Sequence, residues 1–284
     1  MIEVVRPGLL ALVEDLGRPG LAHLGVGRSG AADLPSLLLA NHLVGNRPSA
    51  AAIELTLGGA AFRFASTATV AVTGAPAPAT VDGRPVDLAA QVRVPAGETL
   101  KVGRPPVGLR TYVAVRGGIA VPPVLGSRSR DTLAGIGPAQ LARGDRLPIG
   151  SDVDSAPGGP APDVPPVVAD PVLRVYPGPR VDWFDDAALD TLFGDVYQVT
   201  PMSDRVGMRL AGGRLAYRRV GELPPEGVVT GSLQVPPEGQ PVLFLADHPL
   251  TGGYPVIGVV AAADVGLAAQ VRPGGRIRFV PAED

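Results

Sequence analysis

The chain has 284 residues, and its 38 Gly and 32 Pro make up about a quarter of them, roughly twice the usual share. Both residues are poor helix formers, so a mainly helical protein is excluded. Hydrophobic residues make up 45% of the chain, charged residues only 18%, and the net charge is −2 at pH 7, which excludes wholesale disorder. We therefore expect a globular chain of short strands and many turns.

The clearest local element is a helix that begins after Asp33. Asp33 suits the N-cap position, Pro35 lies in the first turn, and the leucines of 37–43 supply an apolar face. Gly45 follows where a left-handed C-cap favours glycine. A second helix is predicted over 183–192, with its Asp residues on the polar side.

Strand and turn signals dominate the rest of the chain. The runs 68–72 and 112–115 are rich in β-branched residues. Asp-Gly at 82–83, between apolar residues, is a strong signal for a β-hairpin. Two further apolar runs, 241–246 and 256–261, flank a Gly-rich loop. This spacing favours an antiparallel barrel or sandwich over repeating βαβ units.

A Pro- and Gly-rich segment at 151–171 predicts a linker between two domains. We predict an N-terminal β module at 1–150 and a C-terminal β module at 172–284. Two short segments resemble one another: Val-Val-Arg-Pro-Gly at 4–8 and Arg-Val-Tyr-Pro-Gly at 174–178. Two related modules would show such a similarity. Chance repetition in a chain of this composition is the alternative.

The sequence Gly-Val-Gly-Arg-Ser-Gly at 25–30 fits a dinucleotide-binding fingerprint, and Glu54 lies where a ribose-binding acid would follow. That fingerprint requires a strand directly before it within a βαβ unit, whereas Pro19-Gly20 stands upstream here. We therefore do not predict a dinucleotide site. Binding of an anion by N–H groups before the helix remains open.

Two polar regions in the second half suggest ligand binding. Arg205 and Arg209 could together hold a carboxylate or phosphate, although solvated charges at a strand end would look the same. The apolar run 241–246 delivers Asp247 and His248 to the Gly-rich loop. Neighbouring strand residues point to opposite faces, so we do not predict a catalytic Asp–His pair.

Several classes of protein and site are excluded. Without Cys there are no disulfides, thiolate nucleophiles or Cys-based zinc sites, and the three His are far apart, so we predict no metal site. No apolar run approaches the roughly 18 residues of a membrane helix, and the N-terminus is not a signal peptide. We expect a cytoplasmic protein with a small-molecule substrate and neither membrane nor nucleic-acid partners.

Eight segments resemble one family in the order that the family has them: 13–20, 25–26, 29–33, 40–46, 124–129, 203–207, 233–236 and 251–255. The family is the biotin-dependent carboxyltransferase-like proteins, which include the C subunit of 5-oxoprolinase (KipA) and were also called allophanate hydrolase subunit 2. Four positions depart from its usual residues: Glu14, Ala32, Arg130 and Leu250. None of these removes an essential charge, but Arg130 could alter a local polar contact.

The resemblance implies a mainly β fold of two cyclophilin-like antiparallel β-barrel modules with a few short helices. It implies a hetero-oligomer with a KipI-like B subunit and with an A subunit. Together these subunits would convert 5-oxoproline to L-glutamate at the expense of ATP with Mg²⁺. The B and C subunits would activate the lactam by phosphorylation, and the A subunit would complete the hydrolysis.

Such a reaction needs Arg side chains for carboxylate and phosphoryl oxygens, and acids for the metal or the lactam N–H. By residue type, the reaction that the resemblance implies suggests catalytic roles for Asp15, Arg18, Asp204, Arg205 and Asp247, although Asp247 lies outside the matching segments. It implies substrate-binding roles for Ser29, Asp33, Asn41, Arg209, Gln234, Thr251 and Tyr254.

Two other functions are compatible with the same resemblance. The chain could be the carboxyltransferase component of a biotin-dependent urea or amide carboxylase, with biotin as cofactor and the biotin-bearing domains on other chains. It could instead be a regulatory protein that antagonises a KipI-like kinase inhibitor by binding it.

Overall fold

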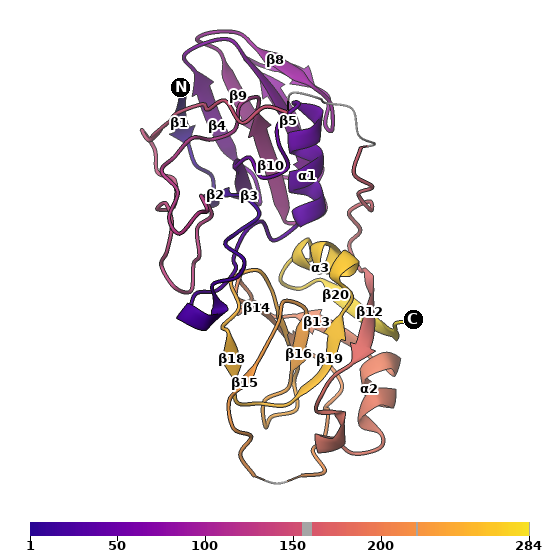
Figure 1. Cartoon of the computed structure of the whole chain (residues 1–284). Helices are drawn as coiled ribbons and strands as arrows, with labels where there is room; N and C mark the ends of the chain where they lie inside the picture. The colour runs from indigo at the N-terminus through magenta and orange to yellow at the C-terminus, as the bar shows by residue number, and fades with distance from the viewer. Residues whose placement is uncertain (155–160, 220, 284) are drawn as a thin grey trace. The chain divides into compact units, whose positions relative to one another are not determined.

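The computed structural model describes residues 1–154, 161–219 and 221–283, in two compact units (Figure 1). Unit 1 comprises Met1–Arg18, Ser29–Asp131 and Gly135–Val167, and unit 2 comprises Pro19–Arg28, Thr132–Ala134 and Val168–Asp284. The main division lies within the predicted linker 151–171, of which residues 155–160 fall outside the described part. The assignment of two short segments of the first half to unit 2 has no counterpart in the sequence prediction.

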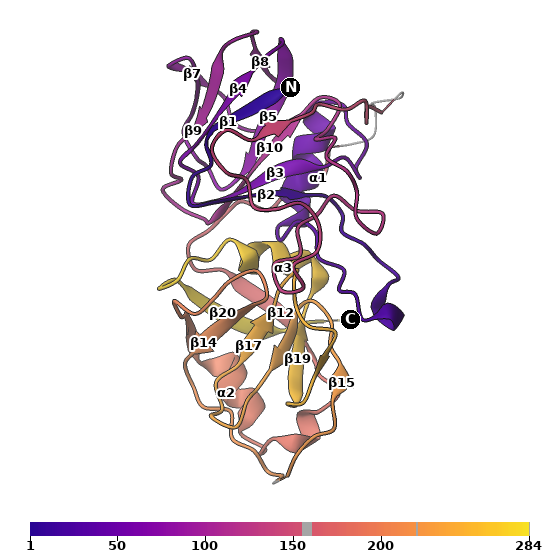
Figure 2. The ribbon, with the colours of Figure 1, turned by 90° about the vertical axis from the view of Figure 1, so that its left-hand side faces the viewer.

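Unit 1 contains two antiparallel sheets (Figure 2). The six-stranded sheet comprises β1 (Ile2–Arg6), β4 (Ala60–Phe64), β6 (Ala79–Val81), β7 (Arg84–Val86), β9 (Thr99–Val102) and β11 (Arg146–Leu147). The five-stranded sheet comprises β2 (Leu10–Glu14), β3 (Ala52–Thr56), β5 (Ala68–Gly74), β8 (Val92–Val94) and β10 (Arg110–Val115). Their strand orders are β11-β1-β4-β9-β6-β7 and β2-β3-β10-β5-β8.

Alternate residues of both sheets enter one shared core. Phe62 and Phe64 of the six-stranded sheet meet Val70, Val72 and Val113 of the five-stranded sheet there, and all five are buried. This is the pattern of a sheet with a two-residue period and one face turned inward. The two sheets of unit 1 therefore form a sandwich.

Helix α1 (Leu34–Leu43) covers the outer face of the five-stranded sheet, against Ala71, Tyr112 and Ala114. The prediction for this helix is confirmed. The Asp33 carboxylate accepts from Ser36 N at 3.1 Å, which caps the helix start. After the helix, Gly45 has φ +68°, the left-handed conformation that glycine adopts without strain.

The Asp-Gly hairpin is also confirmed. Strands β6 and β7 pair with Val81 opposite Arg84, so that Asp82 and Gly83 form a two-residue turn. Their φ values are +44° and +82°, both positive as a type I′ turn requires.

Unit 2 is a closed seven-stranded barrel in the order β12-β19-β16-β17-β14-β13-β20. Its strands are β12 (Val172–Pro177), β13 (Val196–Val199), β14 (Gly207–Ala211), β16 (Ser232–Gln234), β17 (Val242–Phe244), β19 (Val256–Val260) and β20 (Arg276–Pro281). A separate pair consists of β15 (Glu226–Gly227) and β18 (Thr251–Gly252). The other elements are α2 (Ala188–Gly194), α3 (Ala262–Ala269), and the 3₁₀ turns η1 (Ala22–Leu24) and η2 (Val181–Trp183).

The predicted helix at 183–192 is wrong in its first half. The chain forms η2, then an extended residue, Phe184, and a turn at 186–187, and only then α2. Phe184 interrupts the helix because it bridges to Tyr217 and packs edge-on against that ring, 5.3 Å between centroids. A tertiary contact thus overrides the local helical pattern. Helix α3, which packs beside β12, was not predicted.

The mainly β prediction is confirmed, but the two units differ in topology. In each unit the first strand pairs with the last: β1 with β11, and β12 with β20. The first of these pairs is antiparallel and the second is parallel. The sheet closes into a barrel in unit 2, whereas the described strands of unit 1 form two sheets. The sequence similarity between 4–8 and 174–178 thus falls on strands with corresponding positions but different pairing.

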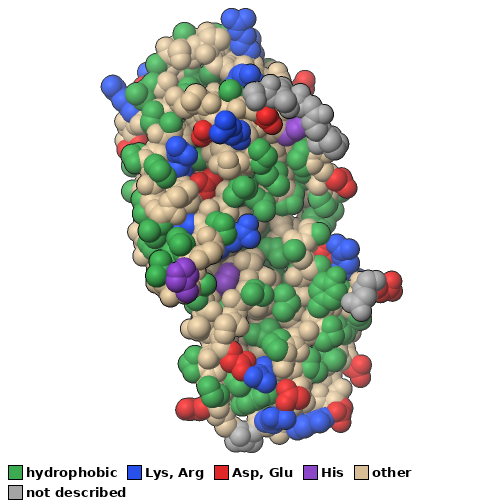
Figure 3. All heavy atoms as spheres, in the orientation of Figure 1, with side chains coloured by type: hydrophobic (Ala, Val, Ile, Leu, Met, Phe, Trp, Pro, Cys, Tyr) green, Lys and Arg blue, Asp and Glu red, His purple; other side chains and the backbone are tan. Residues whose placement is uncertain are grey.

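The 25 basic and 27 acidic residues of the chain give it a net charge of −2. Figure 3 shows acidic and basic side chains interspersed on the face that it draws. Unit 2 contributes exposed ion pairs between Arg218 and Asp186 and between Arg219 and Asp182. Exposed pairs of this kind contribute little to stability. Among the described residues, no helix has both the length and the apolar character needed to cross a bilayer.

Candidate functional site

Each unit buries one polar cluster that contains predicted catalytic residues. In unit 1 the Asp15 cluster consists of Asp15, Arg18, Ser127 and Ser129. In unit 2 the Asp247 cluster consists of Asp247, Arg205 and Thr132. Except for Thr132, which is exposed, these side chains are nine-tenths or more buried.

The Asp15 carboxylate organises the loop that follows β2. Its Oδ1 accepts from Ser127 Oγ and Ser129 Oγ, both at 2.6 Å, and from Gly17 N at 2.8 Å. Its Oδ2 accepts from Arg128 N at 2.6 Å. With four donors the carboxylate is well satisfied, and it fastens segment 127–129 to the end of β2. Asp15 therefore stabilises this loop, and its carboxylate is not free to act as a general base.

Arg18 is the group in this cluster with unused capacity. Its side chain is 2% exposed, and its Nη2 donates to Ser129 O at 2.5 Å. Its Nε and Nη1 atoms have no hydrogen-bond partner within the described part of the chain. A buried guanidinium with two unsatisfied donors is costly. An oxyanion bound there would supply the missing acceptors, since carboxylate and phosphate are the usual partners of Arg.

The approach of segment 29–31 to this loop depends on glycine. Gly30 has φ +102°, and a Cβ there would lie 2.9 Å from Gly17 N. Ala31 N donates to Asp15 O at 3.0 Å. Ser29, a predicted substrate-binding residue, is buried and donates from Oγ to Arg130 O at 3.1 Å. Arg130, a departure from the family pattern, donates from its own Nη1 to Gly135 O at 2.9 Å.

Two other predicted residues of unit 1 have internal partners. The Asp33 carboxylate caps α1 and also accepts from Ser36 Oγ at 2.7 Å. Asn41 Nδ2 donates to Ala50 O at 2.7 Å, and its Oδ1 accepts from Asn46 Nδ2 at 3.0 Å. These bonds account for the burial of both side chains, so both residues act in holding α1 in place.

A buried network below α1 contains Glu54, Tyr112 and Arg110. Glu54 Oε2 accepts from Tyr112 OH at 2.7 Å and from Ala32 N at 3.0 Å, and Asp33 N donates to Tyr112 OH at 2.8 Å. Arg110 Nε lies 3.5 Å from Glu54 Oε1. Burial, and then the negative charges of Glu54 and Asp33, raise the pKa of Tyr112 well above its usual value. The hydroxyl therefore stays protonated and positions the helix start.

In unit 2, Asp247 and Arg205 form a buried ion pair. Arg205 Nε donates to Asp247 Oδ2 at 2.9 Å and Arg205 Nη2 donates to Oδ1 at 3.2 Å. Thr132 donates to the same Oδ2 from its N at 2.9 Å and its Oγ1 at 2.6 Å. The main chain joins the pair as well, because Asp247 N donates to Arg205 O at 3.0 Å. The fold thus brings the two predicted catalytic residues into direct contact, and the hydrogen bonds between them fix the position of both side chains.

The electrostatics of this pair favour the charged carboxylate. Burial alone would raise the pKa of Asp247, but the Arg205 charge and the hydrogen bonds from Arg205 and Thr132 outweigh it and lower the pKa. His248 makes different contacts: its Nδ1 is 2.7 Å from Pro249 O, and its ring stacks on Phe244 at 6.0 Å. These contacts do not join His248 to its neighbour Asp247 as a catalytic pair.

The predicted residues Asp204 and Arg209 lie just before and within strand β14 of the unit 2 barrel. Asp204 Oδ1 accepts from Val206 N at 2.8 Å, which forms a tight turn before β14. Arg209 is exposed on β14, and its N donates to Ser203 Oγ at 3.1 Å. Neither residue contributes its side chain to the contacts described for the Asp247 cluster.

Gln234 supports the loop that carries Thr251 and Tyr254. Its Nε2 donates to Tyr254 O at 3.0 Å. Gly252 lets the loop approach, because a Cβ there would lie 2.2 Å from Gln234 Nε2. Thr251 lies in β18, and both it and Tyr254 are exposed, the latter by 46%. Thr251 and Tyr254 therefore belong to one loop, and Gln234 supports that loop from strand β16.

Sequence reasoning missed three contributors to the clusters. Ser127 and Ser129 lie in a segment that matches the family, yet nothing in their spacing predicts that they bind Asp15. Thr132 stands in no motif, and its contact spans 115 positions. Within 1–154, 161–219 and 221–283, no three His, Asp or Glu side chains gather as metal ligands would.

The comparisons with known proteins point to one family. Residues 24–281 match the carboxyltransferase domain, subdomain A and B. The chain is 39% identical to the C subunit of 5-oxoprolinase from Escherichia coli (strain K12), over 99% of its own length and 91% of that protein. This relative is therefore similar in length as well as in sequence.

Solved structures share the fold. The K. lactis urea amidolyase superposes on 99% of the chain with TM-score 0.93 and 30% identity, and the chain spans 19% of that protein. A protein named TTHA0988 superposes on 98% with TM-score 0.88 and 35% identity, and the chain spans 55% of it. The same fold thus occurs within longer chains.

Proposed function

The chain belongs to the carboxyltransferase domain family, subdomains A and B, and from this premise we propose that it is the C subunit of an ATP-dependent 5-oxoprolinase. With the B subunit it activates 5-oxoproline by phosphorylation, and the A subunit hydrolyses the activated lactam to L-glutamate. The similarity in length supports this choice, because the chain spans 91% of the E. coli 5-oxoprolinase C subunit but 19% of urea amidolyase.

The observation that carries the proposal is the buried Arg18 side chain. Both reactants carry oxyanions: 5-oxoproline has a carboxylate, and the phosphoryl group of ATP has charged oxygens. Phosphoryl transfer depends chiefly on fixed charges that hold such oxygens in position. Arg18 offers Nε and Nη1 without a partner among the described residues, in a loop that Asp15 holds rigid. We assign Arg18 to an oxygen of the bound substrates.

ATP would supply the phosphoryl group, and Mg²⁺ would offset its charge. The unsatisfied donors of Arg18 fit an anionic oxygen of either reactant. The described residues bring no three His, Asp or Glu together.

The proposal includes a hetero-oligomer with the A and B subunits. It is supported by the name of the E. coli relative, which is that of one component of a larger enzyme. The length of TTHA0988 also supports it, because nearly half of that chain lies outside the match. We propose that a separate B subunit takes the corresponding place beside this chain.

A second candidate is the carboxyltransferase component of a biotin-dependent urea or amide carboxylase. The TM-score of 0.93 to urea amidolyase favours it. Biotin would then be the cofactor, carried on another chain, and the oxyanion held by Arg18 would be a carboxylate. This candidate function requires no ATP-dependent reaction of 5-oxoproline.

Co-expression with the A and B subunits separates the candidates. The purified complex should form L-glutamate and ADP from 5-oxoproline and ATP, and should lose this activity when the chain is omitted. Carboxylation of urea with a biotinylated partner, without glutamate formation, would instead support the second candidate. Stable binding to the B subunit without turnover of either substrate would contradict both and indicate a regulatory role.

A further inference from the structure

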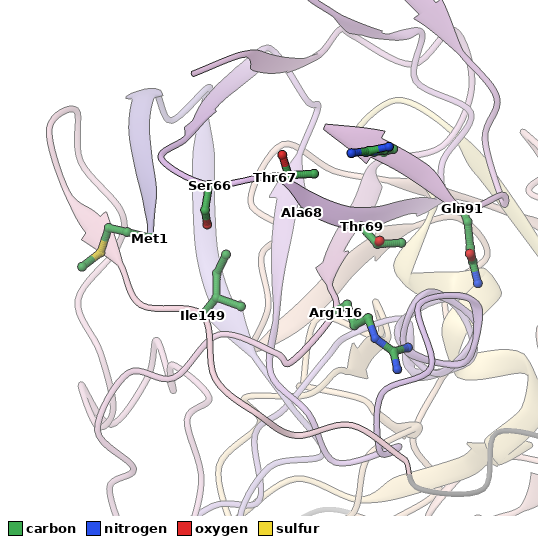
Figure 4. A pocket seen from close by; sticks show the side chains of 9 residues that line it. Met1, Ser66, Thr67, Ala68, Thr69, Gln91, Arg116 and Ile149 are labelled. Carbon is green, nitrogen blue, oxygen red and sulfur yellow. The ribbon is translucent and has the colours of Figure 1, made fainter. Parts of the chain in front are cut away.

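Unit 1 contains a polar cavity of about 520 Å³ that shares no lining residue with the Asp15 cluster. We call it the Arg93 cavity after one of its lining residues. Its lining comes from the start of β5, the start of β8 and the residue that follows β10, and it includes Met1 and Ile149. Figure 4 shows side chains from neighbouring strands around it, with Gln91 and Arg116 directed toward the helix.

The alternation of the strands explains why polar side chains meet there. Val70 of β5 enters the core, so Thr69 points to the opposite face. Arg93 of β8 stands opposite Thr69 in the register, on the same face. Arg116 follows the core residue Val115, and its N donates to Thr69 O at 2.8 Å. Because α1 ends at Leu43, this part of the face is left without a helix.

Two of the lining side chains are held at the helix end. Arg116 Nη1 donates to Val44 O at 2.8 Å, and Gln91 Nε2 donates to Leu43 O at 2.6 Å. These bonds occupy the terminal carbonyls of α1, which would otherwise repel an anion. Gly45 makes room for the guanidinium, because a Cβ there would lie 2.5 Å from Arg116 Nη1. The position of Arg116 is therefore set before any ligand binds.

The charge of the cavity is uncompensated by its own lining. Arg93 and Arg116 both line it, and none of its described lining residues is Asp or Glu. Arg93 is exposed, and its guanidinium has no hydrogen bond or ion pair to any residue that the structure describes. Hydroxyl groups of Thr67 and Thr69 add neutral donors at the same wall. Two guanidinium groups with hydroxyl donors and no acid form a setting for an oxyanion.

We propose that the Arg93 cavity binds a small molecule through an oxyanion, a carboxylate or phosphate group held by Arg93 and Arg116. A volume of about 520 Å³ accommodates a metabolite-sized ligand. The inference does not depend on the function proposed above. It uses different residues from the Asp15 and Asp247 clusters and concerns unit 1 alone.

Calorimetric titration of the full-length chain with inorganic phosphate and with succinate tests the proposal. We expect saturable binding of at least one probe, weakened about tenfold or more by Arg93→Gln. Arg116→Gln should weaken it similarly. Arg143→Gln, which removes the same charge from another exposed position, is the matched control and should leave it unchanged.

The Arg93→Gln variant decides the outcome, because its exposed side chain has no structural partner and the fold should melt as in the wild type. Preference for phosphate or for succinate would identify the class of oxyanion. Absence of saturable binding of both probes would overturn the proposal. Equal weakening by Arg93→Gln and Arg143→Gln would also overturn it, since net charge and not the cavity would then govern binding.

Discussion

The buried pair in unit 2 makes a quantitative prediction for Asp247→Asn. Asp247 is 2% exposed and accepts four hydrogen bonds, two from Arg205 and two from Thr132. The substitution leaves the Arg205 charge buried without its counter-charge. Breaking a buried pair in this way costs about 3–5 kcal/mol. We expect the free energy of unfolding of unit 2 to fall by that amount at pH 7.

The assay can follow unit 2 separately. Trp183 is the only Trp of the chain and packs against the barrel core. Its fluorescence during urea denaturation therefore reports on unit 2, without assuming that both units unfold together. The double variant Arg205→Met, Asp247→Leu is the control. It removes both charges and should recover most of the loss.

The same variant predicts a pH dependence. The pKa of Asp247 is lowered in the folded state. Its contribution to stability is therefore present above the ordinary Asp pKa of about 3.9 and is lost as the pH falls through the folded-state value. The difference between wild type and Asp247→Asn should shrink below about pH 4. A cost below about 1 kcal/mol at pH 7, or a difference independent of pH, would refute the reasoning.

Two further predictions concern unit 1 and the turns. Tyr112→Phe removes the hydroxyl that donates to Glu54 and accepts from Asp33 N, and should lower the free energy of unfolding by about 1–3 kcal/mol. Far-UV circular dichroism during urea denaturation measures this, and an unchanged midpoint would contradict it. Gly83→Ala, at φ +82° in open space, should cost about 1–2 kcal/mol, whereas Gly194→Ala, without a left-handed φ, should be neutral or stabilising. Equal effects of the two glycine variants would rule out backbone strain as the cause.

Local elements could be predicted where neighbouring residues determine them. The Asp33 cap and Gly45 define α1, and Asp82-Gly83 defines a hairpin, because each signal acts over a few positions. The break at Phe184 could not be predicted in this way, since it depends on Tyr217. Barrel closure through the parallel pair β12–β20 likewise depends on contacts between distant segments.

The candidate site shows the same limit. Family resemblance marked the segment of Arg18, and the apolar run 241–246 drew attention to Asp247, but a charged loop and a strand end look the same in sequence whether they are solvated or buried. The partnership of Asp247 with Thr132 spans 115 positions and rests on a residue in no motif. That Arg18 is buried with two unused donors, while Asp15 is fully bonded, emerges only in the folded chain.

Arg18→Met tests the central claim most directly, in the complex with the A and B subunits. The side chain has one hydrogen bond and two donors without partners in the described structure, so its replacement should change the free energy of unfolding by no more than about 1 kcal/mol. We predict a loss of about 100-fold or more in 5-oxoproline-dependent ATP hydrolysis, with the complex intact and Arg143→Met unaffected. Near-normal turnover, or a loss of activity that merely follows unfolding, would contradict the claim.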